Sequence, residues 1–121
     1  MIRQIAGLRA YVCDGDGANL GEYRNLTDLI GDLFSAGGVQ LVAIPLARLG
    51  PEFLRLSSGV AGEVLQKLVN YRFRVAVVGD VSAAATNSEP LRDFVRESNR
   101  GATVWFVDDL AELEAKLTAA G

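Results

Sequence analysis

The sequence predicts a single α/β domain, residues 1–121, built on a mixed five-stranded sheet. Two short strand-like runs open the chain, and apolar strand-like runs then alternate with amphipathic helical segments to its end. Alternation of strands and helices favours parallel neighbours with right-handed crossovers, whereas a short turn between two strands favours an antiparallel hairpin. A length of 121 residues is typical of one domain. The predicted order is ββαβαβαβα, with about four helices.

The first elements are predicted to be a hairpin and a helix. Strand-like runs at 2–5 and 8–13 flank an Ala-Gly pair, and glycine permits the positive φ of a tight turn. Apolar residues then recur at helical spacing over 26–34. Asn25 is the expected N-cap of this helix. Asp28 would fall in the first turn, where the helix macrodipole favours a negative charge.

The remaining chain is predicted to supply three buried strands with helices between and after them. Each strand is a continuous apolar run, as expected of parallel strands covered on both faces, at residues 40–44, 73–78 and 103–107. The helices that follow these strands are expected to begin near Ser58, Ser88 and Asp109. The small, polar segment 81–87 is expected to be a loop.

Composition excludes several classes of function. The chain contains no histidine, so imidazole acid–base chemistry and His-based catalytic triads are excluded. Its lone cysteine, Cys13, excludes an internal disulfide and a multi-cysteine zinc site. A net charge of −3 argues against nucleic acid as a partner, because binding to a phosphate backbone needs a basic face. No signal peptide or membrane span is evident, so we expect a cytoplasmic protein without a cofactor or bound metal.

Three aspartates follow predicted strands, at the edge where open α/β sheets usually bind ligands: Asp14, Asp80 and Asp108. Such a pattern is similar to a phosphoacceptor receiver domain, but the acidic pair and the late lysine at a strand end are missing. The stretch 14–19 has some features of a calcium loop without its later ligands and closing glutamate. Turn and cap roles are the simpler interpretation of these aspartates.

The helix start at Ser57-Ser58-Gly59 is the most specific polar feature of the sequence. Unpaired backbone N–H groups and the macrodipole favour an anion at such a position. A plain capping role for the serine is one interpretation. The other is a switch, in which a phosphate on Ser58 or an anion beside it changes a binding surface. Catalysis by Ser58 is not expected, because no histidine exists and no lysine lies nearby to act as a base.

Asn99 and Arg100 are expected to end the helix that begins near Ser88. Asparagine tolerates the left-handed conformation of a helix end, and arginine complements the negative end of the macrodipole. If both residues faced Asp80 or Ser58, the four would form a polar pocket. That pocket is the alternative site.

The runs LARLGPEFLRLSSGVAGEVLQKLVNYRFRVAVVGD and LRDFVRESNRGATVWFV resemble the DUF4180 family of uncharacterised bacterial proteins. The hairpin, the alternating elements and the Ser-Ser-Gly helix start are also similar, more remotely, to STAS domains of the anti-anti-sigma-factor type. In STAS domains a serine or threonine at this helix start is phosphorylated by a partner kinase. That resemblance implies Ser57 or Ser58 as the modified residue, although Leu56 stands where those proteins usually carry an aspartate.

These observations predict a bacterial, non-enzymatic regulatory or protein-interaction module. Its expected site comprises Ser57, Ser58, Gly59, Asp80, Asn99 and Arg100, with no catalytic residue assigned. The expected partner is another protein, with neither nucleic acid nor membrane involved and a homodimer left open. The alternative is a small-ligand or anion-binding protein, or a minor enzyme.

Overall fold

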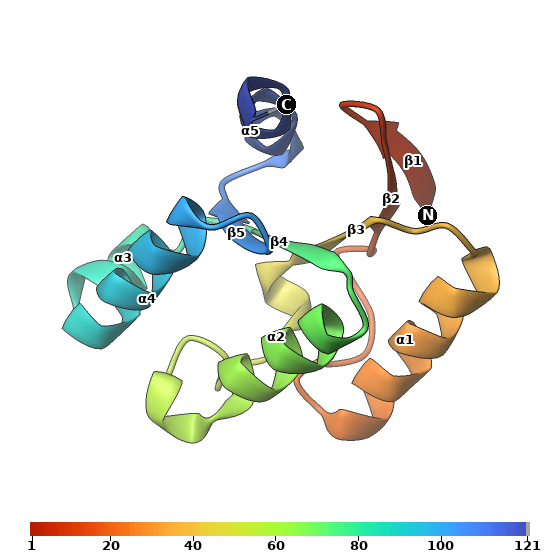
Figure 1. The fold of residues 1–121 in the computed structure, drawn as a ribbon. Coiled ribbons are helices and arrows are strands. Elements are labelled where there is room, and N and C mark those ends of the chain that lie inside the picture. The colour runs from red at the N-terminus through yellow and green to blue at the C-terminus, as the bar shows by residue number, and fades with distance from the viewer. Residues whose placement is uncertain (121) are drawn as a thin grey trace.

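The computed structural model describes residues 1–120 as one five-stranded sheet with helices on both faces (Figure 1). The strands are β1 (Ile2–Ile5), β2 (Leu8–Val12), β3 (Leu41–Pro45), β4 (Arg74–Val78) and β5 (Val104–Val107). They lie side by side in sequence order, with β1 antiparallel to β2 and all other neighbours parallel. The predicted mixed sheet with its N-terminal hairpin is therefore confirmed.

Five helices accompany the strands, four of them longer than two turns. They are α1 (Tyr23–Ala36), α2 (Val60–Asn70), α3 (Ser82–Thr86), α4 (Glu89–Arg100) and α5 (Leu110–Ala120). Two single 3₁₀ turns, Leu46–Arg48 and Leu56–Ser58, lie between β3 and α2. The expectation that 81–87 is a loop was wrong in part, because most of it forms the short helix α3. Three consecutive alanines explain this, since alanine has the highest helix propensity.

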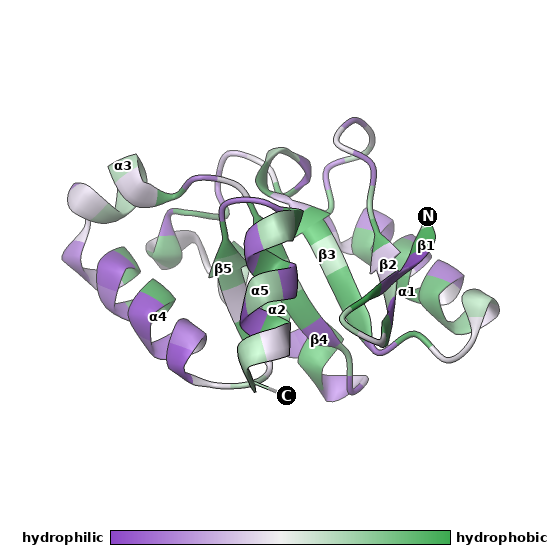
Figure 2. Ribbon diagram, turned by 90° about the horizontal axis from the view of Figure 1, so that it is seen from above, coloured by the Kyte–Doolittle hydropathy of each residue, from purple (hydrophilic) through white to green (hydrophobic). Residues whose placement is uncertain are grey.

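Sequential strand order decides which face each helix covers. Every crossover from β2 to β5 steps in the same direction, and right-handed connections then place α1, α2 and α4 on one face. The helix α5 follows the last strand and lies alone on the opposite face (Figure 1). Two separate groups of buried residues, one on each side of the sheet, match this arrangement. In Figure 2 the central strands are hydrophobic and α4 is hydrophilic along most of its length.

The α5 face of the sheet has small residues at its centre. Ala10, Ala43 and Ala76 come from three adjacent strands and are fully buried. Leu113 and Leu117 of α5 pack in the same apolar cluster. Short side chains in the strands allow the helix to approach the sheet closely, so that one helix covers this part of the face.

The expected caps at Ser88 and Asp109 are confirmed, and the one at Asn25 was wrong. The hydroxyl of Ser88 and the carboxylate of Asp109 accept hydrogen bonds from backbone N–H groups three residues on, as N-caps do. Asn25 is not an N-cap: α1 begins at Tyr23, and the Asn25 amide donates to the Asn19 carbonyl instead. Asp28 consequently lies beyond the first turn, which contains no acidic residue.

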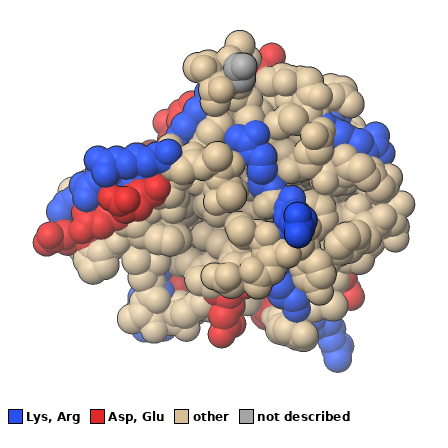
Figure 3. Space-filling model, in the orientation of Figure 1, with Lys and Arg blue, Asp and Glu red and all other residues tan. Residues whose placement is uncertain are grey.

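Charged side chains on α4 are largely paired with one another. Arg96 bonds to Asp93 at 2.9 Å and Arg100 to Glu97 at 3.2 Å, each pair one turn apart. Figure 3 shows these basic and acidic groups side by side along the protruding flank of the molecule. Exposed pairs of this kind contribute about 0–1 kcal/mol each. Within the described residues, no helix is long and apolar enough to cross a bilayer.

Candidate functional site: a polar cavity between β2 and α1

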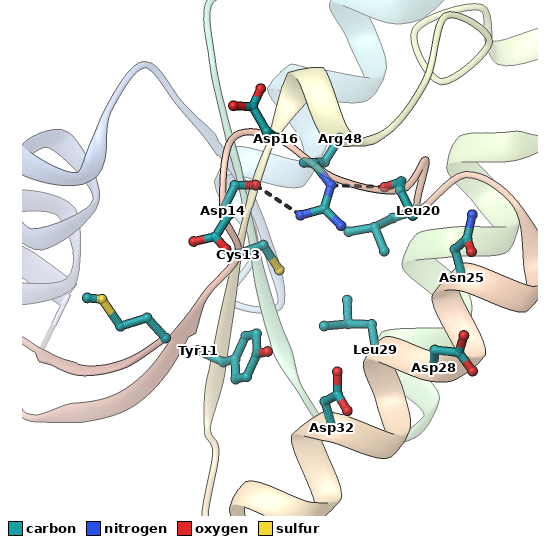
Figure 4. A pocket seen from close by; sticks show the side chains of 12 residues that line it. Tyr11, Cys13, Asp14, Asp16, Leu20, Asn25, Asp28, Leu29, Asp32 and Arg48 are labelled. Atoms are coloured by element: carbon teal, nitrogen blue, oxygen red, sulfur yellow. Dashed lines mark hydrogen bonds between the residues drawn. The ribbon is translucent and has the colours of Figure 1, made fainter.

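A cavity of about 310 Å³ opens between the carboxyl end of β2 and the helix α1 (Figure 4). It lies at the sheet edge where parallel α/β proteins usually bind ligands. The loop after β2, the helix α1 and the 3₁₀ turn after β3 form its walls. Its lining residues are Met1, Tyr11, Cys13, Asp14, Asp16, Ala18, Leu20, Asn25, Asp28, Leu29, Asp32 and Arg48.

Cys13 lies deepest among the polar groups of this cavity. The residue directly follows β2 and is only 6% exposed, and its thiol points into the space between Leu29 and Arg48 (Figure 4). The thiol forms no disulfide and no hydrogen bond with the described part of the chain. Burial raises the pKa of Cys13 to about 11, an effect that the nearby Arg48 charge only partly offsets. The thiol is therefore protonated at neutral pH.

Arg48 ties the loop after β2 to the turn after β3. Its Nε donates to the Ala18 carbonyl at 2.9 Å and its Nη1 to the Asp14 carbonyl at 3.0 Å. Gly17 makes this contact feasible, because a Cβ there would lie 2.8 Å from the guanidinium carbon. The loop after β2 is thus fixed to the turn after β3 by a cation whose hydrogen bonds go to backbone carbonyls.

Carboxylates dominate the mouth of the cavity. Asp28 and Asp32 lie one helical turn apart on the cavity side of α1 (Figure 4), and Asp14 and Asp16 come from the opposing loop. None of these carboxylates forms an ion pair within residues 1–120. The pKa of Tyr11 is raised, first by burial of its phenol and then by the Asp32 charge. The cavity thus combines exposed negative charge with neutral, partly buried phenol and thiol groups.

The serines of the predicted site lie in a 3₁₀ turn just before α2. The Ser58 hydroxyl donates to the Glu52 carbonyl at 2.8 Å and accepts from the Val60 N–H at 3.2 Å. Gly59 separates this turn from the helix and adopts the left-handed conformation, with φ of 81°. Ser58 therefore lies before the helix, and its hydroxyl accepts a hydrogen bond from the Val60 N–H, which has no partner within the helix. Ser57 is exposed, and its side chain has no hydrogen bond among the described residues.

The remaining predicted residues do not join the serines in one pocket. The Asp80 carboxylate accepts from the Ser82 N–H at the carboxyl edge of the sheet, and hydrogen bonding from the Ser82 side chain, and then from its N–H, lowers the pKa of Asp80. Asn99 accepts from the Phe106 N–H of β5. Arg100 borders a surface groove beside Arg74, at the start of β4. Position 74 and Asp80 are six residues apart along an extended strand, so they lie roughly 20 Å from each other. Because α4 runs antiparallel to the strands, its last residues, Asn99 and Arg100, lie towards the amino-terminal ends of the strands, whereas Asp80 lies at their carboxyl ends.

Most of the cavity residues were missed from the sequence, although signals for three of them existed. Asp28 and Asp32 are acids four residues apart in a helix, and no basic residue follows either of them at helical spacing. Placing the helix start at Asn25 gave Asp28 a structural role that it does not have. Cys13 directly follows a strand and so lies at the ligand-binding edge of the sheet. The place of Arg48 depends on a loop conformation that the sequence pattern does not specify.

A metal site is not supported by the arrangement of these side chains. Over residues 1–120, no three Cys, Asp or Glu side chains converge in a way that could hold a metal ion. The cavity carboxylates are spread around its mouth instead of meeting at one point (Figure 4).

Fold and cavity together define a small α/β protein with a polar pocket at the carboxyl edge of its sheet. A profile of the family described as "Domain of unknown function (DUF4180)" matches residues 5–117. Because this match spans nearly the whole chain, the protein belongs to the DUF4180 family. No curated protein and no solved structure matches the chain.

Proposed function

We propose that this protein is a bacterial, cytoplasmic, non-enzymatic binding module whose ligand is a small polar molecule held in the cavity between β2 and α1. One observation carries the proposal: a buried thiol without a hydrogen-bond partner, a phenol and several carboxylates surround a single cavity at the expected edge of the sheet. A volume of about 310 Å³ is at the lower end of the usual range for small-molecule sites, roughly 300–1,000 Å³.

Binding is a better interpretation of this site than catalysis. Burial raises the pKa of Cys13 to about 11, so little of the nucleophilic thiolate exists at neutral pH. The pKa of Tyr11 is raised as well, so its phenol remains a neutral hydrogen-bonding group. No imidazole base can activate either side chain, because the chain contains no histidine.

A thermal-shift screen with a metabolite collection tests this proposal. A ligand at one hundred times its Kd should stabilise the folded protein by about 2.7 kcal/mol. Ala18→Trp adds an indole at the exposed rim of the cavity and should abolish the shift. Ala111→Trp places the same group on exposed α5, far from the cavity, and should leave the shift intact. A shift that survives Ala18→Trp would contradict the proposed site.

A second candidate function is partner binding controlled at the 3₁₀ turn before α2. One observation favours it: Ser57 is exposed and lies in a shallow surface pocket with Arg55 and Ser88. A phosphate on Ser57 would lie in the same surface pocket as Arg55, whose guanidinium now pairs with Glu52, whereas Ser58 is engaged in two hydrogen bonds. Ser57 is therefore the stronger candidate for modification.

Phosphomimetic variants test the partner-binding candidate. Ser57→Asp and Ser57→Ala should fold equally well and differ in the protein that they retain in pull-downs from native lysate. Ser58→Asp should destabilise the protein instead, because it removes the hydrogen bond to the Glu52 carbonyl. Identical pull-down profiles for the two Ser57 variants would exclude the switch.

A further inference from the structure

The lining of the cavity is unbalanced in charge. Four carboxylates border it, from Asp14, Asp16, Asp28 and Asp32, against the guanidinium of Arg48 and the N-terminal amine. Both cations are already engaged with backbone carbonyls: Arg48 bonds to two carbonyls of the loop after β2, and the amine donates to the Val12 carbonyl at 3.0 Å. No carboxylate of the cavity is neutralised by an ion pair among residues 1–120.

The carboxylates on α1 neither complement its macrodipole nor form an ion pair with another described residue. Acidic residues in the first turn of α2, α4 and α5 complement the macrodipole, but the first turn of α1 has none. Asp28 and Asp32 lie further along the helix and repel each other across one turn. Two like charges that line one cavity without an ion-pair partner among the described residues favour a cationic ligand.

The thiol of Cys13 is a second and independent observation. It is 94% buried by residue area, points into the cavity and has no hydrogen-bond partner in the described chain (Figure 4). Leu20 and Leu29 lie beside it and are also buried. The floor of the cavity is thus weakly polar and its mouth is anionic, so that a ligand with two chemically different ends would match both.

We propose that the cavity binds a small primary amine, with its ammonium group between Asp28 and Asp32 and its short apolar body against Leu29 and Cys13. This inference rests on the proposed small-ligand function and adds the chemical class of the ligand. An organic cation is favoured over a metal ion, because no three described carboxylates converge on one point. The Tyr11 hydroxyl, close to Asp32, offers the ammonium group an additional acceptor.

Matched probes separate the charge of a ligand from its shape. Each set consists of an amine, an alcohol and a carboxylate with a similar apolar body. The first set is 2-phenylethylamine, 2-phenylethanol and phenylacetate, and the second is hexylamine, hexanol and hexanoate. Each is titrated into ¹⁵N-labelled full-length protein while amide chemical shifts are recorded. An amine should shift the amides of 13–16 and 28–32, and its Kd should be at least tenfold tighter than that of the matched alcohol. The carboxylates should not bind. Raising NaCl from 50 to 500 mM should weaken amine binding severalfold.

Carboxylate variants test the assigned contacts. The double variant Asp28→Asn, Asp32→Asn keeps the size of both side chains and should weaken amine binding at least tenfold. Glu114→Gln removes one exposed helical charge from α5 and should leave the Kd unchanged. Both proteins should fold like the parent chain, which the dispersion of the same spectra reports.

Three results would overturn the inference, and they affect the proposed function differently. If alcohols or carboxylates bind the cavity amides as tightly as amines, the ligand class is wrong and the small-ligand function stands. If amines bind with the same Kd to the Asp28→Asn, Asp32→Asn protein, the assigned contacts are wrong. If no probe and no compound of a wider fragment collection shifts the cavity amides, the inference and the proposed function both fail.

Discussion

At the scale of single residues, the Cys13 thiol is the titratable group whose pKa is changed most clearly by burial. Its pKa rises from 9.0 to about 11 because burial disfavours the thiolate. In the unfolded chain the thiol loses its proton near pH 9, whereas the folded protein keeps it. The stabilising contribution of the protonated thiol is therefore complete below pH 9 and is lost as the pH rises towards 11.

This titration makes alkaline unfolding depend on Cys13. Between pH 8 and pH 11 the thiol should account for a loss of roughly 2 kcal/mol in the free energy of unfolding. Cys13→Ala lacks the titrating group, so its stability should fall less over this range. Urea unfolding of both proteins at several pH values measures the difference between their free energies of unfolding. Other groups that titrate at alkaline pH are common to both proteins, so their contributions cancel in this difference. Parallel curves for the two proteins would show that the thiol is accessible to water.

A single glycine controls how Arg48 reaches the loop after β2. Gly17 has a φ of 143°, and a Cβ at this position would lie 2.8 Å from the Arg48 guanidinium carbon. Gly17→Ala should cost about 1–3 kcal/mol of stability, from the strained backbone and the displaced guanidinium. Gly15→Ala is the matched control in the same loop, because nothing lies within 4 Å of its added methyl group. Equal stability of the two variants in urea unfolding would contradict the Arg48 contact.

At the scale of elements, α5 stands out because one helix covers the centre of a sheet face. Its contact rests on Leu113 and Leu117, which pack with the buried alanines of the three central strands. Truncating one of these leucines leaves a cavity that short alanine side chains cannot fill.

Leu113→Ala is accordingly expected to destabilise the protein by about 2–5 kcal/mol. Leu113 has no exposed surface. Thr118→Ala changes an exposed position on the same helix and should alter the stability by no more than about 0.5 kcal/mol. Urea unfolding monitored by circular dichroism measures both changes. A loss below about 1 kcal/mol for Leu113→Ala would mean that α5 is not firmly docked.

Most elements follow from local patterns, and the exceptions are the short helix α3 and the start of α1. The hairpin, three buried strands and the caps at Ser88 and Asp109 were predicted because each depends on neighbouring residues in sequence. The start of α1 was misplaced, because the Asn25 side chain bonds to the Asn19 carbonyl in the preceding loop. Ser58 lies one residue before Gly59, the N-cap of α2, and bonds both to the Glu52 carbonyl and to the Val60 N–H.

At the scale of the whole molecule, topology decides which residues meet. The expected polar pocket required residues near Ser58 and Asn99 to converge, whereas α4 carries its last turn to the opposite edge of the sheet. The observed cavity joins Cys13, Asp32 and Arg48, which are distant in sequence and meet through parallel pairing of β2 with β3. The pairing followed from the sequence, but the loop conformation that brings Arg48 to the cavity depends on tertiary contacts.

The central claim is that the cavity between β2 and α1 binds a small ligand, and protection of Cys13 from alkylation tests it most directly. Cys13 is the only cysteine, so the rate of N-ethylmaleimide addition at pH 8, followed by mass spectrometry, reports access to the cavity floor. A compound that stabilises the protein should slow this reaction at least tenfold at saturation. An alkylation rate that is unchanged by every stabilising compound would show that ligands bind elsewhere and would contradict the assignment.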